Sequence, residues 1–323
     1  MLKKLKIDSF VLAIIISIVI AYFFPFLGAK DSPVNLNLIN SLGISFIFFF
    51  YGLSLENEAI KNGLKNWKLH VSVQLSTFLL FPLIIMPFYP LFKDTEYELL
   101  WLAFLFMAAL PSTVSSSVVL VSMARGNLPA AIFNASISGI LGVLFTPLWL
   151  LPFAHKTDVA FDFSAIYAQL ATEIVIPLAL GLLLRRFLAK WAIRHKKTLD
   201  RFDKFIILLI IYKSFVQSFE ENIFSSIDLT TMFVIIVLVL GLFYFIYHLT
   251  GWISRALKFN HADTITNQYC GTKKSLVHGA VFSEALFGKS SVVGILLLPL
   301  MFYHAFQIFI ISIYASKEAK RKT

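Results

Sequence analysis

Long apolar stretches separated by short charged or turn-rich borders dominate this chain. They show no alternation of apolar and polar residues with a period of two, which argues against barrel strands. Each stretch is close to the roughly 20 residues with which an α-helix spans a bilayer. We expect helices at 10–27, 36–53, 69–89, 98–123, 128–151, 164–188, 202–219, 229–257, 262–287 and 291–316. The pattern predicts an all-α polytopic membrane protein with ten transmembrane helices.

Composition and charge support this class. Hydrophobic residues make up 58% and charged residues 14% of the 323 positions, against about 45–50% and 25% in soluble domains. This balance excludes a soluble enzyme and a nucleic-acid partner, although the net charge is +10. With ten helices, most of the 28 Lys and Arg residues fall on the side of the N-terminus, as the positive-inside rule predicts for the cytoplasmic side. We expect both termini in the cytoplasm and a multi-pass protein of the cell (plasma or inner) membrane.

The ten segments also form two halves. The starts of the first five segments map onto those of the last five with similar offsets, and an odd number of segments per half makes the repeats inverted. The sequence therefore predicts one membrane transporter domain, 1–323, with inverted repeats at 1–152 and 164–316. Inverted repeats are typical of secondary transporters.

Segments four and nine are interrupted at corresponding positions. Segment four contains Pro111, which removes a backbone donor, followed by a hydroxyl cluster that includes Ser115, Ser116 and Ser117. Segment nine contains Gly271 among the polar residues Asn267, Gln268, Thr272, Lys273 and Lys274. Such paired interruptions point to a transporter's binding site. Two alternatives remain open: a proline kink at a helix–helix contact in segment four, and a cytoplasmic loop in segment nine.

Ionisable groups inside predicted spans carry an insertion cost of at least about 2.5–3.5 kcal/mol each. Glu173 is expected to line a cleft or to pair with a buried lysine. Lys213 either has a role inside the protein or extends to the interface, and Glu284 is expected to be solvated near the outer end of segment nine. Asn134 and Ser138, one turn apart, either bind an ion or join helices.

Motifs for other chemistries are absent from the sequence. The seven His residues show no paired metal-ligand spacing, and no Gly-x-Ser-x-Gly nucleophile motif occurs. We therefore do not expect an enzyme or a cofactor, with a sodium ion as the candidate exception.

Two tracts give the chain a resemblance to a known family. Segment four with its Leu110-Pro111 pair, and Tyr269-Cys270-Gly271-Thr272-Lys273-Lys274-Ser275-Leu276, resemble the bile acid:sodium symporter family. The second tract, followed by Tyr303-His304-Ala305-Phe306-Gln307, is most similar to the branch of the seventh member of solute carrier family 10. The resemblance implies a panel domain of segments one, two, six and seven. The other six would form a core domain in which the broken fourth and ninth helices cross.

The same resemblance implies alternating-access transport of a small organic anion with sodium. This sequence departs from the family at the sodium ligands: Tyr269 stands at the family's acidic position, and Lys273 and Lys274 replace its Gln-Asn pair. Our hypothesis is that one lysine replaces at least one sodium ion. The alternatives are a proton-coupled or uncoupled anion carrier, and a non-transporting membrane regulator or scaffold. Substrate identity and oligomeric state are not indicated.

Overall fold

Helices are the only regular elements in the part of the chain that the structure describes. The computed structural model describes residues 9–29, 32–54, 66–113, 115–150, 152–153, 168, 171–220, 228–287 and 292–321. Within these residues, five helices are long and apolar enough to cross a membrane: Leu36–Ser54, Trp67–Phe92, Leu128–Leu150, Leu229–Ala256 and Val293–Ala319. The all-α prediction is confirmed for these residues, whereas the count of ten spans and the repeat symmetry remain predictions.

The chain divides into two compact units, each assembled from separate stretches. Unit 1 comprises Met1–Leu55, Thr157–Ser226 and Ala280–Ile295, and unit 2 comprises Glu56–Lys156, Ile227–Gly279 and Leu296–Thr323. The main helices of unit 1 are α1 (Ser9–Phe23), α2 (Leu36–Ser54), the π-helical turn η6 (Ala171–Val175), α11 (Ile176–Arg194) and α12 (Lys196–Glu220).

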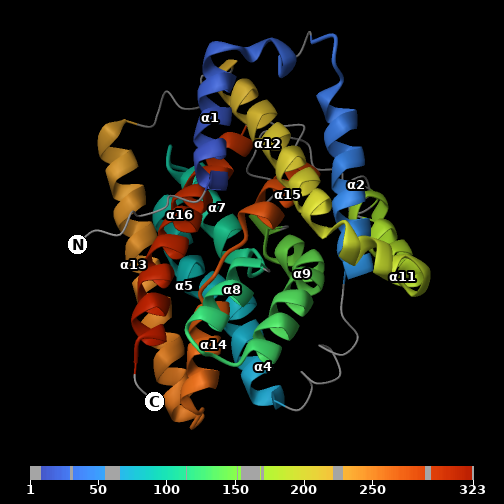
Figure 1. The fold of residues 1–323 in the computed structure, drawn as a ribbon. Coiled ribbons are helices and arrows are strands. Elements are labelled where there is room, and N and C mark those ends of the chain that lie inside the picture. The colour runs from blue at the N-terminus through green and yellow to red at the C-terminus, as the bar shows by residue number, and fades with distance from the viewer. Residues whose placement is uncertain are drawn as a thin grey trace. The chain divides into compact units, whose positions relative to one another are not determined.

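In unit 1, α2 and α11 lie side by side (Figure 1). The two backbones are close at Gly52 and Gly181, where a Cβ atom on either glycine would collide with the backbone of the other helix. The absence of side chains at these two positions therefore sets the helix spacing. The helices α1 and α12 form the second contact of this unit.

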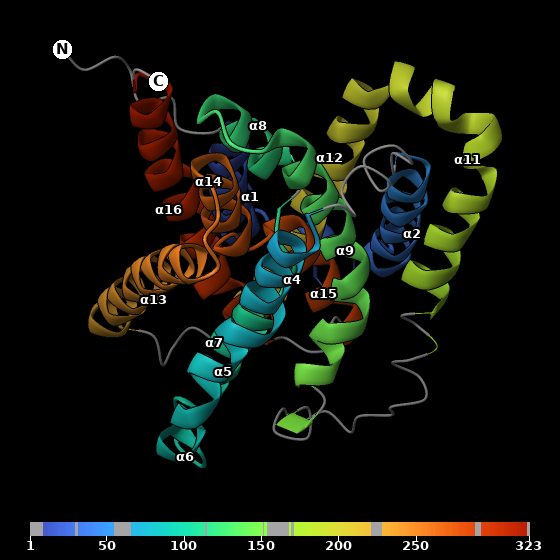
Figure 2. The same ribbon diagram turned by 90° about the horizontal axis from the view of Figure 1, so that it is seen from below.

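Unit 2 contains the helices that carry the two predicted interruptions. Segment three is nearly continuous, from α4 (Trp67–Leu75) through the π-helical turn η3 (Ser76–Leu80) to α5 (Phe81–Ile85), η4 (Met86–Phe88) and α6 (Tyr89–Phe92). The others are α7 (Glu98–Ala109), α8 (Ser115–Met123), α9 (Leu128–Leu150), α13 (Leu229–Ala256) and α14 (His261–Gly271). Two more, α15 (Leu276–Phe287) and α16 (Val293–Ala319), begin in one unit and end in the other. Figure 2 shows α8 and α4 against α9, and α14 against α13.

The outward faces of the helices are apolar. Of the most hydrophobic 18-residue stretch of α13, only 22% is buried inside the protein. The exposed side chains of this helix include Phe233, Val237 and Phe245. Exposed apolar surface of this extent requires an apolar solvent. The helix therefore has the character of a lipid-facing span.

A buried carboxylate ties three segments of unit 2 together. Asp263, on the first turn of α14, accepts hydrogen bonds from the side-chain amides of Asn66, Asn127 and Asn260, at 2.7–3.1 Å. Asn127 also caps α9 by accepting the backbone N–H of Ala130. Three donors stabilise the carboxylate where it is only 7% exposed, and the contacts hold the starts of α4, α9 and α14 together.

Candidate functional site

Four carbonyl groups beside the break between α7 and α8 accept hydrogen bonds from outside these two helices. Pro111 has no N–H, and the N–H of Ser112 donates to the hydroxyl of Ser138 on α9. The carbonyl of Ala109 accepts the hydroxyl of Thr146. The carbonyl of Pro111 accepts the backbone N–H of Ser275, from the break between α14 and α15. The two interrupted helices therefore meet directly.

Lys274 satisfies the other two carbonyls. Its Nζ atom lies 2.6 Å from the carbonyl oxygen of Ala108 and 2.9 Å from that of Leu110. A third bond, 2.7 Å long, goes to the carbonyl oxygen of Thr77. The side chain is fully buried. We call these three carbonyl groups the Lys274 cage.

Local backbone geometry explains why the Thr77 carbonyl is available. In the π-helical turn η3, the N–H of Phe81 donates to Ser76 and not to Thr77. The next residue, Pro82, has no N–H to offer. The carbonyl of Thr77 is therefore free to accept Lys274, and π-helical turns of this kind occur often at functional sites.

The cage is suited to a charged ammonium. An ammonium has three N–H donors, and the three carbonyls accept one each. A neutral amine would turn its lone pair toward one of the carbonyl oxygens. The cage also lies at the C-terminal end of α7, where the helix dipole favours a cation, and the ring of Phe81 lies 4.1 Å from Nζ as a cation–π partner.

The break in segment nine, between Gly271 and Leu276, is held by α16. Gln307 accepts the backbone N–H of Lys274 at 2.8 Å and donates to the carbonyl of the same residue at 2.7 Å. The hydroxyl of Tyr303 donates to the carbonyl of Thr272. These bonds replace the lost helical pairing and fix the backbone from which Lys274 extends.

Lys273 extends to a different part of the crossing. Its Nζ atom donates to the hydroxyl of Ser116 at 3.2 Å, and Ser116 and Ser117 both bond to the hydroxyl of Thr113. This group lies at the N-terminal end of α8. Lys273 is fully buried, and within the described ranges neither it nor Lys274 forms an ion pair.

Some predicted site residues bond elsewhere. Asn134 pairs with Gln74 on α4. Asn267 donates to Thr250 and Ser254, and Gln268 donates to Tyr247, all on α13. Ser138 and Thr272 take part in the crossing through the bonds given above, and Pro111 and Gly271 mark the two breaks. The side chain of Ser115 lies outside the described residues.

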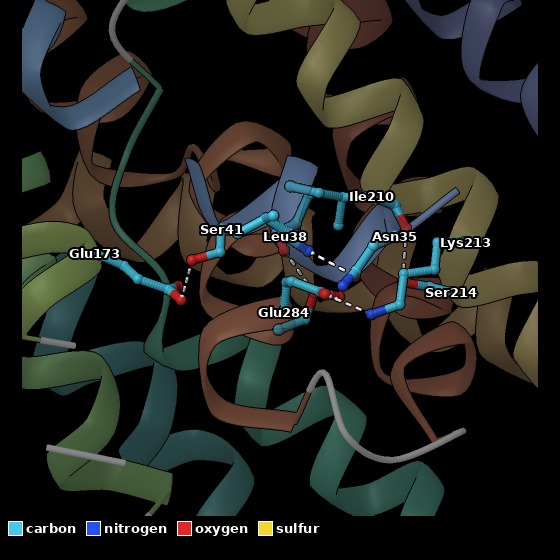
Figure 3. Close-up of polar contacts among 10 residues, drawn as sticks. Asn35, Leu38, Ser41, Glu173, Ile210, Lys213, Ser214 and Glu284 are labelled. Carbon is cyan, nitrogen blue, oxygen red and sulfur yellow. Dashed lines mark hydrogen bonds and ion pairs between the residues drawn. The ribbon is translucent and has the colours of Figure 1, made fainter. Parts of the chain in front are cut away.

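In unit 1, the structure corrects the expectation for Glu284. This side chain is buried, not solvated, and its Oε1 atom lies 2.6 Å from Nζ of Lys213. Lys213 is likewise buried and does not extend to the interface. Glu173 accepts a hydrogen bond of 2.6 Å from the hydroxyl of Ser41 (Figure 3), and both residues belong to unit 1.

The sequence pattern did not indicate the roles of Thr77 and Phe81. Thr77 contributes a main-chain oxygen, which any residue could supply. The one local signal is Pro82, five positions later, which has no N–H to donate to this carbonyl. Gln307 belongs to the tract from Tyr303 to Gln307 that resembles the family, but the sequence predicted no role for it.

The fold and the site define a helical membrane protein with two broken helices that meet through their main chains. The chain belongs to the SBF-like CPA transporter family, whose model matches residues 8–320. It is 33% identical to sodium/bile acid cotransporter 7-B of Xenopus laevis, over 97% of this chain and 92% of the relative. It is 34% identical to the uncharacterized protein PA2026 of Pseudomonas aeruginosa, over 98% and 94% of the two chains. Sodium/bile acid cotransporter 7 of Danio rerio is 31% identical, over 97% and 94%.

Proposed function

We propose that this protein is a secondary transporter of a small organic anion in which the ammonium of Lys274 takes the place of a coupling sodium ion. The observation that carries the proposal is the Lys274 cage. In ion channels, main-chain carbonyl oxygens replace the hydration shell of alkali cations. Here they surround a cation that is covalently attached to the protein.

The oxygen ligands at the crossing outside the Lys274 cage do not suit a sodium ion. The hydroxyls of Thr113, Ser116 and Ser117 are neutral, and the ammonium of Lys273 lies among them. A second cation beside it would be repelled. We therefore expect transport that does not depend on sodium.

Lys273 is the residue that we assign to the anion. It is fully buried, and among the described residues it donates one hydrogen bond, to the hydroxyl of Ser116. Two of the three N–H donors of the ammonium therefore have no partner among those residues. The N-terminal end of α8 adds the positive end of a helix dipole. A carboxylate or sulfonate would neutralise the charge, which is costly to bury alone.

The wider mechanism follows the family. We assign unit 1 to the panel and unit 2 to the core, with alternating access produced by movement of one against the other. The membership of each unit supports this assignment, since the four expected panel segments all fall in unit 1. The names of the vertebrate relatives support a cotransporter, and the distribution of Lys and Arg supports cytoplasmic termini in the cell membrane.

Uptake into proteoliposomes tests the proposal. Radiolabelled taurocholate, benzoate, pyruvate and succinate would each be offered in matched sodium and potassium buffers. We expect uptake of at least one probe at the same rate in both buffers, lost in Lys273→Gln and kept in Lys68→Gln, which removes an exposed lysine. Uptake that requires sodium would show that Lys274 does not replace the ion. Normal uptake by Lys273→Gln would contradict the role given to Lys273.

A further inference from the structure

A long run of basic residues lies where α11 ends and α12 begins, within unit 1. Positions 185–204 hold eight Lys or Arg residues and two Asp residues. The two helices join at His195, whose carbonyl oxygen accepts the backbone N–H groups of Thr198 and Leu199 (Figure 1). The transport proposal makes no use of this charge, and like charges held this close together repel one another.

The protein-facing side of this junction is apolar. Ala192 on α11 and Leu199 on α12 are buried against Leu53 on α2, and Leu188 packs against the same cluster. Leu188 and Ala192 are one turn apart and therefore lie on a single face of α11. This face fixes the end of α11 to the rest of unit 1.

The opposite face of α11 is basic. Arg186, Lys190 and Arg194 recur at every fourth position, so they lie on successive turns along one side of the helix. All three side chains are exposed, and none of them belongs to an ion pair among the described residues. We call these three residues the basic stripe.

Exposed aromatic side chains accompany the basic stripe. Phe187 is 66% exposed, and the guanidinium group of Arg186 lies 4.5 Å from the centre of its ring. Trp191, one turn further along, is 44% exposed. Trp and basic residues are enriched at the boundary between a membrane and water, and a purely ionic partner would not require exposed rings. The combination therefore favours a lipid surface.

The basic stripe also lies at the expected depth of the lipid head groups. The sixth predicted span ends at position 188, and α11 continues without a break to Arg194, about 9 Å further along the helix axis. The head-group layer on each side of the hydrocarbon core is about 5–8 Å thick. Earlier in α11, the exposed side chains include Leu180 and Leu183, which suit lipid tails. The basic face thus follows directly on an apolar one.

We infer that the basic stripe binds the phosphate groups of anionic phospholipids, with Phe187 and Trp191 lying among the upper parts of the acyl chains. Guanidinium groups donate paired hydrogen bonds to phosphate oxygens. The negative charge of the lipids offsets the repulsion within the run of basic residues. The bound lipids attach the end of α11 to the membrane surface. This inference goes beyond the proposed function and does not depend on transport.

Native mass spectrometry of the full chain in detergent tests the binding. Dioleoylphosphatidylglycerol and dioleoylphosphatidylcholine carry the same acyl chains and differ in head-group charge, and each would be titrated separately. We expect the wild type to bind the phosphatidylglycerol more tightly. The affinity for this lipid should fall by about tenfold or more when the charges of the basic stripe are removed. The variant that does so combines Arg186→Gln, Lys190→Gln and Arg194→Gln.

A matched control removes the same number of exposed basic residues from unit 2. It combines Arg255→Gln, Lys258→Gln and Lys317→Gln. This control should bind phosphatidylglycerol like the wild type. If the control weakens binding as much as the stripe variant does, the lipid responds to net charge alone and the assignment to the basic stripe is wrong.

Tryptophan fluorescence gives a second measurement that does not depend on the folding of the stripe variant. Lipids with brominated acyl chains quench Trp side chains that touch them, and the difference between the wild type and Trp191→Phe isolates the signal of Trp191. We expect brominated phosphatidylglycerol to quench Trp191 more strongly than brominated phosphatidylcholine. Equal affinity of the wild type for both lipids, or equal quenching of Trp191 by both, would overturn the proposal. Binding of polyglutamate without any lipid preference would assign the stripe to an acidic protein partner and would also overturn it.

Discussion

The Nζ atom of Lys274 lies 2.9 Å from the carbonyl oxygen of Leu110, 164 positions earlier in the chain. Leu110 directly precedes the proline that breaks segment four, and Lys274 belongs to the break in segment nine. The two interruptions therefore complement each other. Carbonyl oxygens beside the break in segment four accept hydrogen bonds, and the ammonium in the break of segment nine donates them. This relationship makes Lys274 a structural part of the crossing as well as a charge.

Loss of the Lys274 ammonium should destabilise the protein. In Lys274→Met the carbonyls of Thr77, Ala108 and Leu110 lose their donor, and a buried acceptor left unsatisfied costs about 1–3 kcal/mol. We expect a clear fall in the midpoint of thermal unfolding in detergent. Lys68→Met, at an exposed position of α4, is the control and should unfold like the wild type. Equal midpoints for the two variants would mean that the cage carries little stability.

An emptied cage should bind sodium. Lys274→Ala removes the ammonium but leaves three carbonyl oxygens around its position. A ligand that binds only the folded state stabilises it by RT ln(1 + [L]/Kd). We expect the unfolding midpoint of Lys274→Ala to rise with sodium chloride and not with potassium chloride. The wild type should respond alike to both salts, and a wild type stabilised by sodium would contradict the replacement of the ion by Lys274.

The close approach of α2 and α11 gives a test of unit 1. A Cβ atom on Gly181 would collide with the carbonyl group of Phe49, which as backbone cannot turn aside. Gly181→Ala should therefore lower the unfolding midpoint, although alanine favours a helix by about 1 kcal/mol over glycine. Gly241→Ala on α13 is a matched control, since nothing lies within 4 Å of its added Cβ atom. It should leave stability equal or slightly raised, and the same result for both variants would contradict the packing.

The sequence predicted the helices and the two breaks because these follow from local signals. Apolar runs specify helices, and Pro111 cannot continue one. The two lysines were recognisable as expensive groups in an apolar segment.

The partners of these residues could not be predicted in the same way. Thr77 supplies a main-chain oxygen, so its identity carries no signal. Glu284 was expected in water because it lies near the end of an apolar run, but it pairs with Lys213, 71 positions away. Only the tertiary structure brings two such residues together, and a single sequence gives no measure of that distance.

The start of α13 should respond to acid through Asp228. This residue caps the helix outside its span, and its carboxylate accepts the backbone N–H of Thr231 at 2.7 Å. That hydrogen bond lowers the pKa of Asp228 from its ordinary value. A group whose pKa is lowered by folding contributes its stability fully above the unfolded pKa, about 3.9 for Asp, and loses it as the pH falls through the lower folded value.

Amide hydrogen exchange at Thr231 and Met232 measures this contribution. Protection in the wild type should fall in strong acid, whereas Asp228→Asn, whose neutral amide also caps helices, should show no such acid dependence. Asp228→Ala should show weak protection at every pH. Parallel acid responses in the wild type and Asp228→Asn would place the titrating group elsewhere.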